Sequence, residues 1–275
     1  ARDDVPLPQT QPIVWRGRYR RSLGTLRYQV RLLLVIQIPT IVLALMAHAE
    51  SLGPGRFAGL TLGVRTVSIG GLWLVAITVL STTAAGLIPS ERSRQTLDAL
   101  LVSPLSGRDI VLQYIAGLRR TVLALVVPFV TMFCVPLTCP GSWLDAVLYL
   151  VGSLASLAVL IPLILWTSML IGMRSRSQVR AVLTSALFLL AWSVLPLSIY
   201  AIASDTWNAL AVVALSPTSI VLPLGLEQYP VVAWEIVALG CMTYGSLAWL
   251  IRKYCLDHAD ALLGRSDGAV AQEGC

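Results

Sequence analysis

The stretch WLDAVLYLVGSLASLAVLIPLILWTSMLI, from Trp143 to Ile171, holds a single charged residue, Asp145. A helix needs roughly 20 mostly apolar residues to cross a bilayer core about 30 Å thick, so this stretch predicts a membrane span. The whole chain has the same character: of its 275 residues, 56% are hydrophobic and 12% are charged, with a mean hydropathy of +0.78. A soluble domain usually has about 25% charged residues. The chain is therefore predicted to be a multi-pass membrane protein.

Six segments reach the length and apolar character of a span: Leu32–Ala49, Thr66–Ile88, Thr121–Leu137, Trp143–Ile171, Val179–Ala203 and Val231–Ile251. Spanning β-strands would be about ten residues long and would alternate apolar with polar residues. The predicted fold is therefore an all-α integral membrane protein with six transmembrane helices. Prolines lie inside four segments, at Pro39, Pro128, Pro162 and Pro196. Membrane helices tolerate proline because neighbouring groups bond the freed carbonyls, so these prolines are expected to kink the spans rather than end them.

Arginine and lysine residues concentrate on one side of the predicted membrane. Eighteen lie in the N-terminal arm, the 90–120 and 174–180 connections and the C-terminal tail, whereas Arg56 and Arg65 lie on the other side. Because cytoplasmic loops carry the excess of these residues, both termini are predicted to be cytoplasmic. The expected location is the plasma membrane, which in bacteria is the inner membrane. The net charge of +6 is thereby explained by topology, and a nucleic-acid partner is not expected.

The N-terminal region divides into a polar lead-in, residues 1–12, and an amphipathic segment, residues 13–31. The apolar stripe of this segment consists of Trp15, Tyr19, Leu23, Leu26 and Val30, and arginines such as Arg16 and Arg20 lie off it. An arginine-rich face beside an aromatic and aliphatic stripe is typical of a helix that lies in the membrane interface. The alternative is an unstructured basic arm that acts only as a topology signal. Residues 32–251 are predicted to form one six-span domain, followed by a polar cytoplasmic tail, residues 252–275.

The connection between the second and third predicted spans reads PSERSRQTLDALLVSPLSGRDIVL, from Pro89 to Leu112. Pro89 is expected to end the second span, and Ser90 to cap a short helix that begins at Glu91, an acid at the positive end of the helix dipole. The apolar side of that helix consists of Leu97, Leu100 and Leu101, and the residues that stop it are Ser103 and Pro104.

A second helix is predicted after this stop. Ser106 and Asp109 are three residues apart and resemble a capping box, which marks a helix N-terminus. This helix leads to Arg119 and Arg120, which are expected at lipid phosphates on the membrane face or at a contact with a partner. The connection is therefore predicted to be a stiff element made of a short helix, a tight turn and a second helix.

The run ERSRQTLDALLVSPLSGRDIVL resembles the signature between the second and third spans of ATP-binding-cassette (ABC) permeases of the type-2 exporter family. The matching residues are Glu91, Arg92, Thr96, Leu97, Leu100, Leu101, Ser103, Pro104, Leu105, Ser106 and Ile110. In two places the sequence departs from the signature: Gln95 stands where the family commonly has glycine, and Gln113-Tyr114 where it commonly has Gly-Lys. The N-terminal QPIVWRGRYRR also resembles the opening interfacial helix of that family.

The resemblance implies that the connection is a coupling helix, which docks into a groove on a separate ATPase subunit. The residues that it assigns to this contact are Glu91, Arg92, Arg94, Thr96, Leu97, Leu100, Leu101, Ser103 and Pro104. It also implies a pathway enclosed by two permease subunits, identical or homologous, and driven by two ATPase subunits that bind ATP and Mg²⁺. The alternative, on capping and apolar spacing alone, is an amphipathic hairpin that packs on the bilayer face.

No catalytic or metal-binding pattern is visible in the sequence. The chain lacks the GxxxxGK[ST] phosphate loop and its one lysine is Lys253, so ATP hydrolysis is expected in the partner rather than here. His48 and His258 fall on opposite sides of the predicted membrane, and no cysteine–histidine cluster has zinc spacing. The chain is therefore expected to be a transporter subunit without an enzymatic site or bound cofactor of its own.

Two other functions stay open on the sequence. A non-transporting membrane anchor or assembly scaffold would show the same docking helix. A lipid-acting membrane enzyme is the less favoured alternative, because it would need a cluster of acids, histidines or metal ligands in one leaflet. Asp145 and Glu235 are the acids in or beside spans, and an intramembrane acid is a candidate functional residue. Both lie near the predicted outer boundary, so they are expected at the interface or, failing that, at the pathway.

Overall fold

The regular secondary structure of the described residues is helical. The computed structural model describes residues 26–51, 58–93, 95, 105–138, 143–202, 217 and 230–264. The α-helices are α2 (Leu26–Ser51), α3 (Ala58–Ala85), α4 (Leu87–Ser93), α6 (Gly107–Gly117), α7 (Arg119–Phe133), α8 (Trp143–Arg174), α9 (Gln178–Ile202), α11 (Pro230–Asp257) and α12 (Ala259–Leu263). A short 3₁₀ helix, η2 (Val135–Thr138), follows α7. The prediction of an all-α fold is confirmed for this part of the chain.

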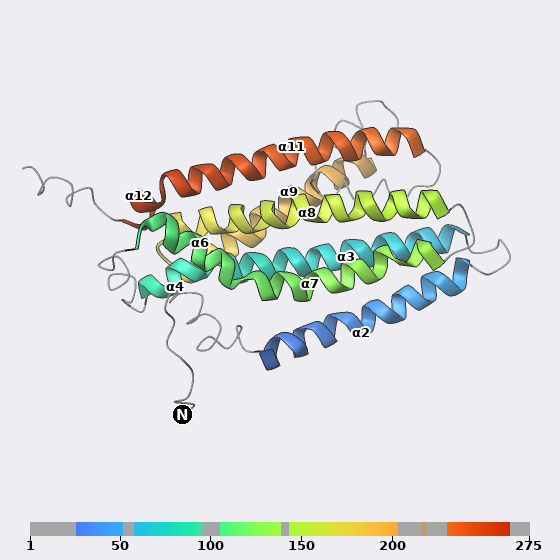
Figure 1. Cartoon of the computed structure of the whole chain (residues 1–275), viewed down its shortest axis with the longest axis horizontal. Helices are drawn as coiled ribbons and strands as arrows, with labels where there is room; N and C mark the ends of the chain where they lie inside the picture. The colour runs from blue at the N-terminus through green and yellow to red at the C-terminus, as the bar shows by residue number, and fades with distance from the viewer. Residues whose placement is uncertain are drawn as a thin grey trace, which may run out of the picture.

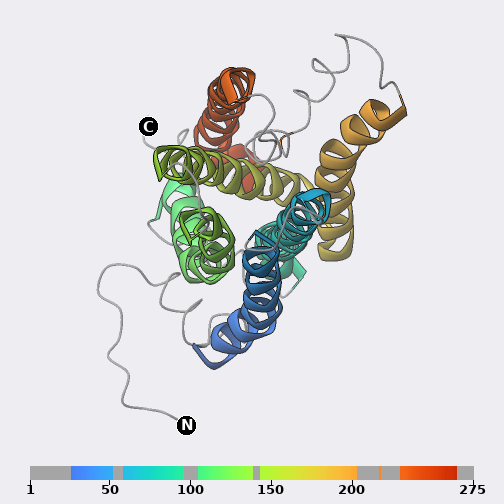
Figure 2. The ribbon, with the colours of Figure 1, turned by 90° about the vertical axis from the view of Figure 1, so that its right-hand side faces the viewer.

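The long helices run side by side, and the short helices α4, α6 and α12 gather at one end, called here the α12 end (Figure 1). Helix α8 packs against α11, α3 and α9, while α2 packs against α7 and α3. Figure 2 looks along the helices from the opposite end and shows α9 leaning away from its neighbours toward its C-terminus. The two turns that join α8 to α9 and α11 to α12 both lie at the α12 end.

Five helical stretches of the described chain are long and apolar enough to cross a membrane: Arg27–Ala49, Val67–Ser93, Gly107–Thr138, Trp143–Arg174 and Gln178–Pro196. They correspond to the first five predicted spans, and a multi-pass membrane protein is the fold that they support. The sixth predicted span, Val231–Ile251, lies within α11. Because α11 is not among these five stretches, the count of six stays a prediction. Prolines lie inside α2, α7, α8 and α9 without ending them, as the sequence predicts.

The outward faces of the outer helices are apolar. Val35 on α2 is 70% exposed and Leu187 on α9 is 64% exposed. Apolar side chains in such numbers on the surface would be unfavourable in water, whereas lipid tails accept them without loss. The centre is packed with fully buried groups such as Leu80, Leu160 and Met169. Four buried aromatic rings, Trp73, Phe129, Phe133 and Tyr149, contact one another in that order at centroid distances of 4.8, 5.9 and 6.3 Å.

A few hydrogen bonds join the apolar helices. The Gln37 side chain on α2 donates its Nε2–H to Thr131 Oγ1 on α7 at 2.8 Å. Ser185 on α9 donates to Ser168 on α8 at 3.0 Å, and both side chains are fully buried. Polar pairs of this kind stabilise membrane helix contacts by about 0.6 kcal/mol on average. They lie on the faces of α2 and α9 that turn toward α7 and α8.

The end of the second span differs from the prediction. Pro89 does not end it, and Ser90 does not cap a new helix. The break falls at Gly86, and α4 then runs from Leu87 through Ser93. Ser90 lies inside α4, where its N–H donates to the Gly86 carbonyl and its hydroxyl to the Leu87 carbonyl. Proline is tolerated here because it lies in the first turn of α4, where its missing N–H removes no bond within α4.

The break at Gly86 is accompanied by a close crossing of α3 and α8. Pro89 has no N–H to donate to the Ala85 carbonyl, four residues earlier. Gly172 of α8 lies against that carbonyl: a Cβ on Gly172 would be 2.6 Å from Ala85 O. Only glycine allows the two backbones to approach this closely. Tertiary packing thus occupies the space beside the carbonyl that the helix itself leaves unpaired.

The two ends of the chain also differ from the predicted boundaries. Helix α2 begins at Leu26, so Leu26 and Val30 belong to the helix of the first span, while residues 13–25 of the predicted interfacial helix lie outside the described part. Helix α11 continues past Ile251 to Asp257, and α12 follows. The residues after Ile251 were expected to fade into a polar tail, but Cys255 and Leu263 are buried. The cause is packing of α12 against α6 and α8.

Candidate functional site

The candidate site comprises α4 and α6, which flank the connection called here the loop, residues 94–104. Of the predicted coupling residues, the structure describes Glu91 and Arg92. The others lie outside the described residues: Arg94, Thr96, Leu97, Leu100, Leu101, Ser103 and Pro104. The same applies to the predicted interface residues Trp15, Arg16, Tyr19, Arg20 and Leu23. The site is therefore described from its two anchored ends.

Arg92 holds the first end of the loop. Its guanidinium donates to the Leu262 carbonyl of α12 at 2.8 Å and to the Ser175 carbonyl, between α8 and α9, at 3.4 Å. A guanidinium stays protonated in proteins, so Arg92 carries a positive charge. A cation at the C-terminal carbonyls of a helix is favourable because it complements the helix dipole. Arg92 thus bonds α4 to α12 and to the α8–α9 turn.

Glu91 and Gln95 shape the same end. Glu91 is only 3% exposed, so its side chain is buried within the described fold. Gln95 has φ = 56°, in the left-handed region, and its N–H donates to the Arg92 carbonyl at 3.1 Å. This conformation costs a non-glycine residue roughly 1–2 kcal/mol.

The second end of the loop is the N-terminus of α6. Ser106 caps this helix: its Oγ accepts the Asp109 N–H at 3.1 Å and donates to Asp109 Oδ2 at 2.6 Å. The predicted cap is therefore confirmed. The next residue, Gly107, donates its N–H to Asp260 Oδ1 on α12 at 3.0 Å. A Cβ on Gly107 would lie 2.5 Å from that oxygen, so a larger residue would displace the Asp260 carboxylate from this contact.

Asp260 was not among the predicted site residues. It lies 153 residues after Gly107 in the chain, and no local pattern marks it. Arg119 and Arg120, which were predicted, begin α7 directly after a turn at Leu118. Arg119 is exposed and Arg120 half-buried. Neither is in the group of bonds around α12.

Cations on α8 and α11 lie over aromatic rings of the same two helices. Arg174 donates to the Tyr254 hydroxyl at 3.1 Å, and its Cζ lies 5.7 Å from the centre of that ring. Arg252 lies over Trp166 at 5.9 Å and Lys253 over Trp249 at 5.5 Å. Aromatic residues paired with cations are typical of a membrane–water interface. The arrangement agrees with the charge asymmetry of the sequence.

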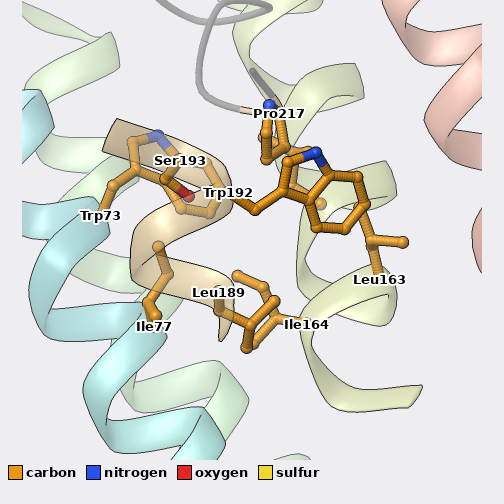
Figure 3. Close-up of a pocket in the computed structure, with 9 residues that line it drawn as sticks. Trp73, Ile77, Leu163, Ile164, Leu189, Trp192, Ser193 and Pro217 are labelled. Atoms are coloured by element: carbon orange, nitrogen blue, oxygen red, sulfur yellow. The ribbon is translucent and has the colours of Figure 1, made fainter. Parts of the chain in front are cut away.

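A second candidate is an apolar pocket between α3, α8 and α9 (Figure 3). Its cavity volume is about 10 Å³, which is about the space that one water molecule needs. Its lining consists of Trp73, Ile77, Leu160, Leu163, Ile164, Leu189, Trp192, Ser193 and Pro217. No lining residue is charged, so the pocket is a small apolar gap between the helices. Asp145 and Glu235, the candidate pathway acids, are exposed on α8 and α11 and are not part of this lining.

The described residues contain no group of three histidine, cysteine or acidic side chains that could hold a metal ion. No family model matches the chain, and no curated protein is detectably similar to it in sequence. The function must therefore be inferred from the residues themselves. The most informative are those that anchor the loop between α4 and α6.

Proposed function

We propose that the chain is the membrane-spanning permease subunit of an ABC exporter. In this proposal, two such subunits, identical or homologous, enclose a pathway in the plasma membrane, and both termini lie in the cytoplasm. Two separate ATPase subunits bind ATP and Mg²⁺ and dock on the predicted helix Glu91–Val102. The proposal rests first on the resemblance of ERSRQTLDALLVSPLSGRDIVL to the coupling signature of type-2 exporters.

The observation that carries the proposal furthest is the anchoring of this loop at both ends. Arg92 bonds two carbonyls from other parts of the fold, and the Gly107 N–H bonds Asp260. A hairpin that merely rests on the bilayer has no need of such bonds. An element that transmits a displacement does, because a flexible root would absorb the motion. The anchoring therefore favours a coupling element over a passive hairpin.

The apolar, arginine-poor interiors of the spans favour an amphiphilic or lipid-like cargo over a sugar or an ion. A polar cargo would need hydrogen-bonding or charged groups to replace its hydration. Asp145 and Glu235 would then contact solvent or lipid headgroups at the outer interface.

Affinity purification of the full chain in mild detergent tests the proposal. The readouts are ATP hydrolysis in the eluate and identification of a co-purified chain that carries a phosphate loop. Leu97→Glu and Leu101→Glu place a charge on the expected apolar side of the docking helix. Gln178→Glu is the matched control, because it adds the same charge at an exposed position at the α12 end.

An ATPase that accompanies the native chain and the control, and is lost from both leucine variants while they still insert, supports the exporter. A native chain that purifies without any ATPase refutes it. Co-purification of other membrane or cytoplasmic proteins instead would favour the anchor or scaffold.

A further inference from the structure

Helix α12 is bonded to both ends of the loop. Before the loop, Arg92 donates to the Leu262 carbonyl at 2.8 Å. After the loop, Gly107 donates to Asp260 Oδ1 at 3.0 Å. Since α12 comprises only Ala259–Leu263, the two ends of the loop are held by one and the same turn of helix.

Helix α12 is itself firmly joined to α11. The Leu262 N–H donates to the His258 carbonyl at 2.9 Å, and the His258 N–H to the Tyr254 carbonyl at 3.1 Å. The His258 ring stacks on the Tyr254 ring at a centroid distance of 4.5 Å. These contacts bridge the turn between α11 and α12, so the two helices are expected to move together.

The fit of α12 against α6 is close as well as bonded. A Cβ on Gly107 would lie 2.5 Å from Asp260 Oδ1 and 3.0 Å from the Asp260 nitrogen. Ala259 is 1% exposed and Leu263 is 2% exposed, so apolar packing holds α12 on both sides of Asp260. Gly264, with φ = 86°, ends the helix directly afterwards.

We propose that α12 is a strap that positions α4 and the N-terminus of α6 relative to α11, with Asp260 and Arg92 as its positioning residues. Because α4 and α6 both bond to α12, a displacement of these two helices moves the end of α11 with them. The positioning role follows from the bonds alone. The transmission of an ATPase-driven displacement to α11 rests on the proposed function.

Amide hydrogen exchange of the full chain in detergent tests the positioning role. Gly107 is the first residue of α6, so its N–H has no acceptor within the helix, and its protection depends on Asp260. Asp260→Ala removes the acceptor and is expected to accelerate exchange of this amide about tenfold, the effect of losing one charged hydrogen bond. Asp260→Asn retains an oxygen at this position and is expected to restore near-native exchange.

Asp257→Ala is the matched control, since it removes an exposed carboxylate three residues earlier. Unchanged exchange at Gly107 in Asp260→Ala would overturn the strap, as would equal acceleration in Asp257→Ala. Gly107→Ala offers a second variant, whose methyl group must push α12 away and is expected to accelerate exchange in residues 259–264.

Transmission is tested in the complex with the ATPase. A non-hydrolysable ATP analogue is expected to change exchange both in residues 94–104 and in residues 259–264 of the native chain. Asp260→Ala is expected to keep the ATPase and the change in 94–104, but to lose most of the change in 259–264. A change in 259–264 that persists in Asp260→Ala refutes transmission through the strap. If no ATPase binds the native chain, the proposed function fails, whereas the exchange of Gly107 still decides the positioning role.

Discussion

Gly172→Ala should separate α8 from α3 at their close crossing. The new Cβ would lie 2.6 Å from Ala85 O, 3.1 Å from Ala85 Cα and 3.2 Å from Ala85 C. All three are backbone atoms, so no side chain can rotate away to relieve the clash. The helices must move apart instead, close to the break at Gly86 between α3 and α4.

The expected loss follows from two opposing effects. Overpacking a tight core usually costs about 1–3 kcal/mol, and the rigid neighbours place this site at about 3 kcal/mol. Alanine is favoured over glycine inside a helix by about 1 kcal/mol, which leaves a net loss of about 2 kcal/mol. Gly245→Ala is the matched control on α11, because its Cβ would meet only Val159 methyl groups at 3.9 Å. Gly245→Ala should raise the free energy of unfolding by up to about 1 kcal/mol.

The free energy of unfolding, measured by titration with sodium dodecyl sulphate in mixed micelles, checks both variants. The free energy of unfolding of Gly172→Ala should be about 3 kcal/mol lower than that of Gly245→Ala. If the two variants were equally stable, the close backbone contact at Ala85 would not exist in the protein, and the explanation of the break at Gly86 would fail with it.

Three further predictions concern the cap, a buried thiol and an interhelical bond. Ser106→Ala should lower the free energy of unfolding by about 1 kcal/mol through loss of the α6 cap, measured in the same titration. Burial, offset in part by Arg174, raises the pKa of the Cys255 thiol from 9.0 to about 12. Since this thiol ionises first in the unfolded chain, stability should fall as the pH rises from 9 toward 12, and Cys255→Ala should reduce that fall. Folded Cys255 should also resist alkylation at neutral pH. Thr131→Val should cost about 0.6 kcal/mol by breaking the bond from Gln37, and adding Gln37→Leu should recover most of it, as a double-mutant cycle would show.

Local interactions at the loop could be predicted wherever both partners lie within one turn of helix. The cap of α6 is the clearest example, since Ser106 and Asp109 are three residues apart and the motif contains its own acceptor and donor. The end of the second span was predicted wrongly because its position depends on a contact between residues far apart in the chain. Pro89 is a strong local signal, but the break between α3 and α4 falls at Gly86, where Gly172 of α8 approaches the Ala85 backbone.

The sequence by itself determined the helical class of the fold, the apolar spans, the uneven distribution of arginine and the cap of α6. Each of these depends on composition or on neighbours a few residues apart, which a linear pattern records. Only the tertiary structure decided how the loop is held. Arg92 reaches carbonyls 83 and 170 residues away, and Gly107 bonds a carboxylate 153 residues away. Backbone carbonyls carry no signature of their own, and an acid after the last span looks like any solvent-exposed charge. Such partners become recognisable only when packing brings α12 against α6 and within reach of Arg92.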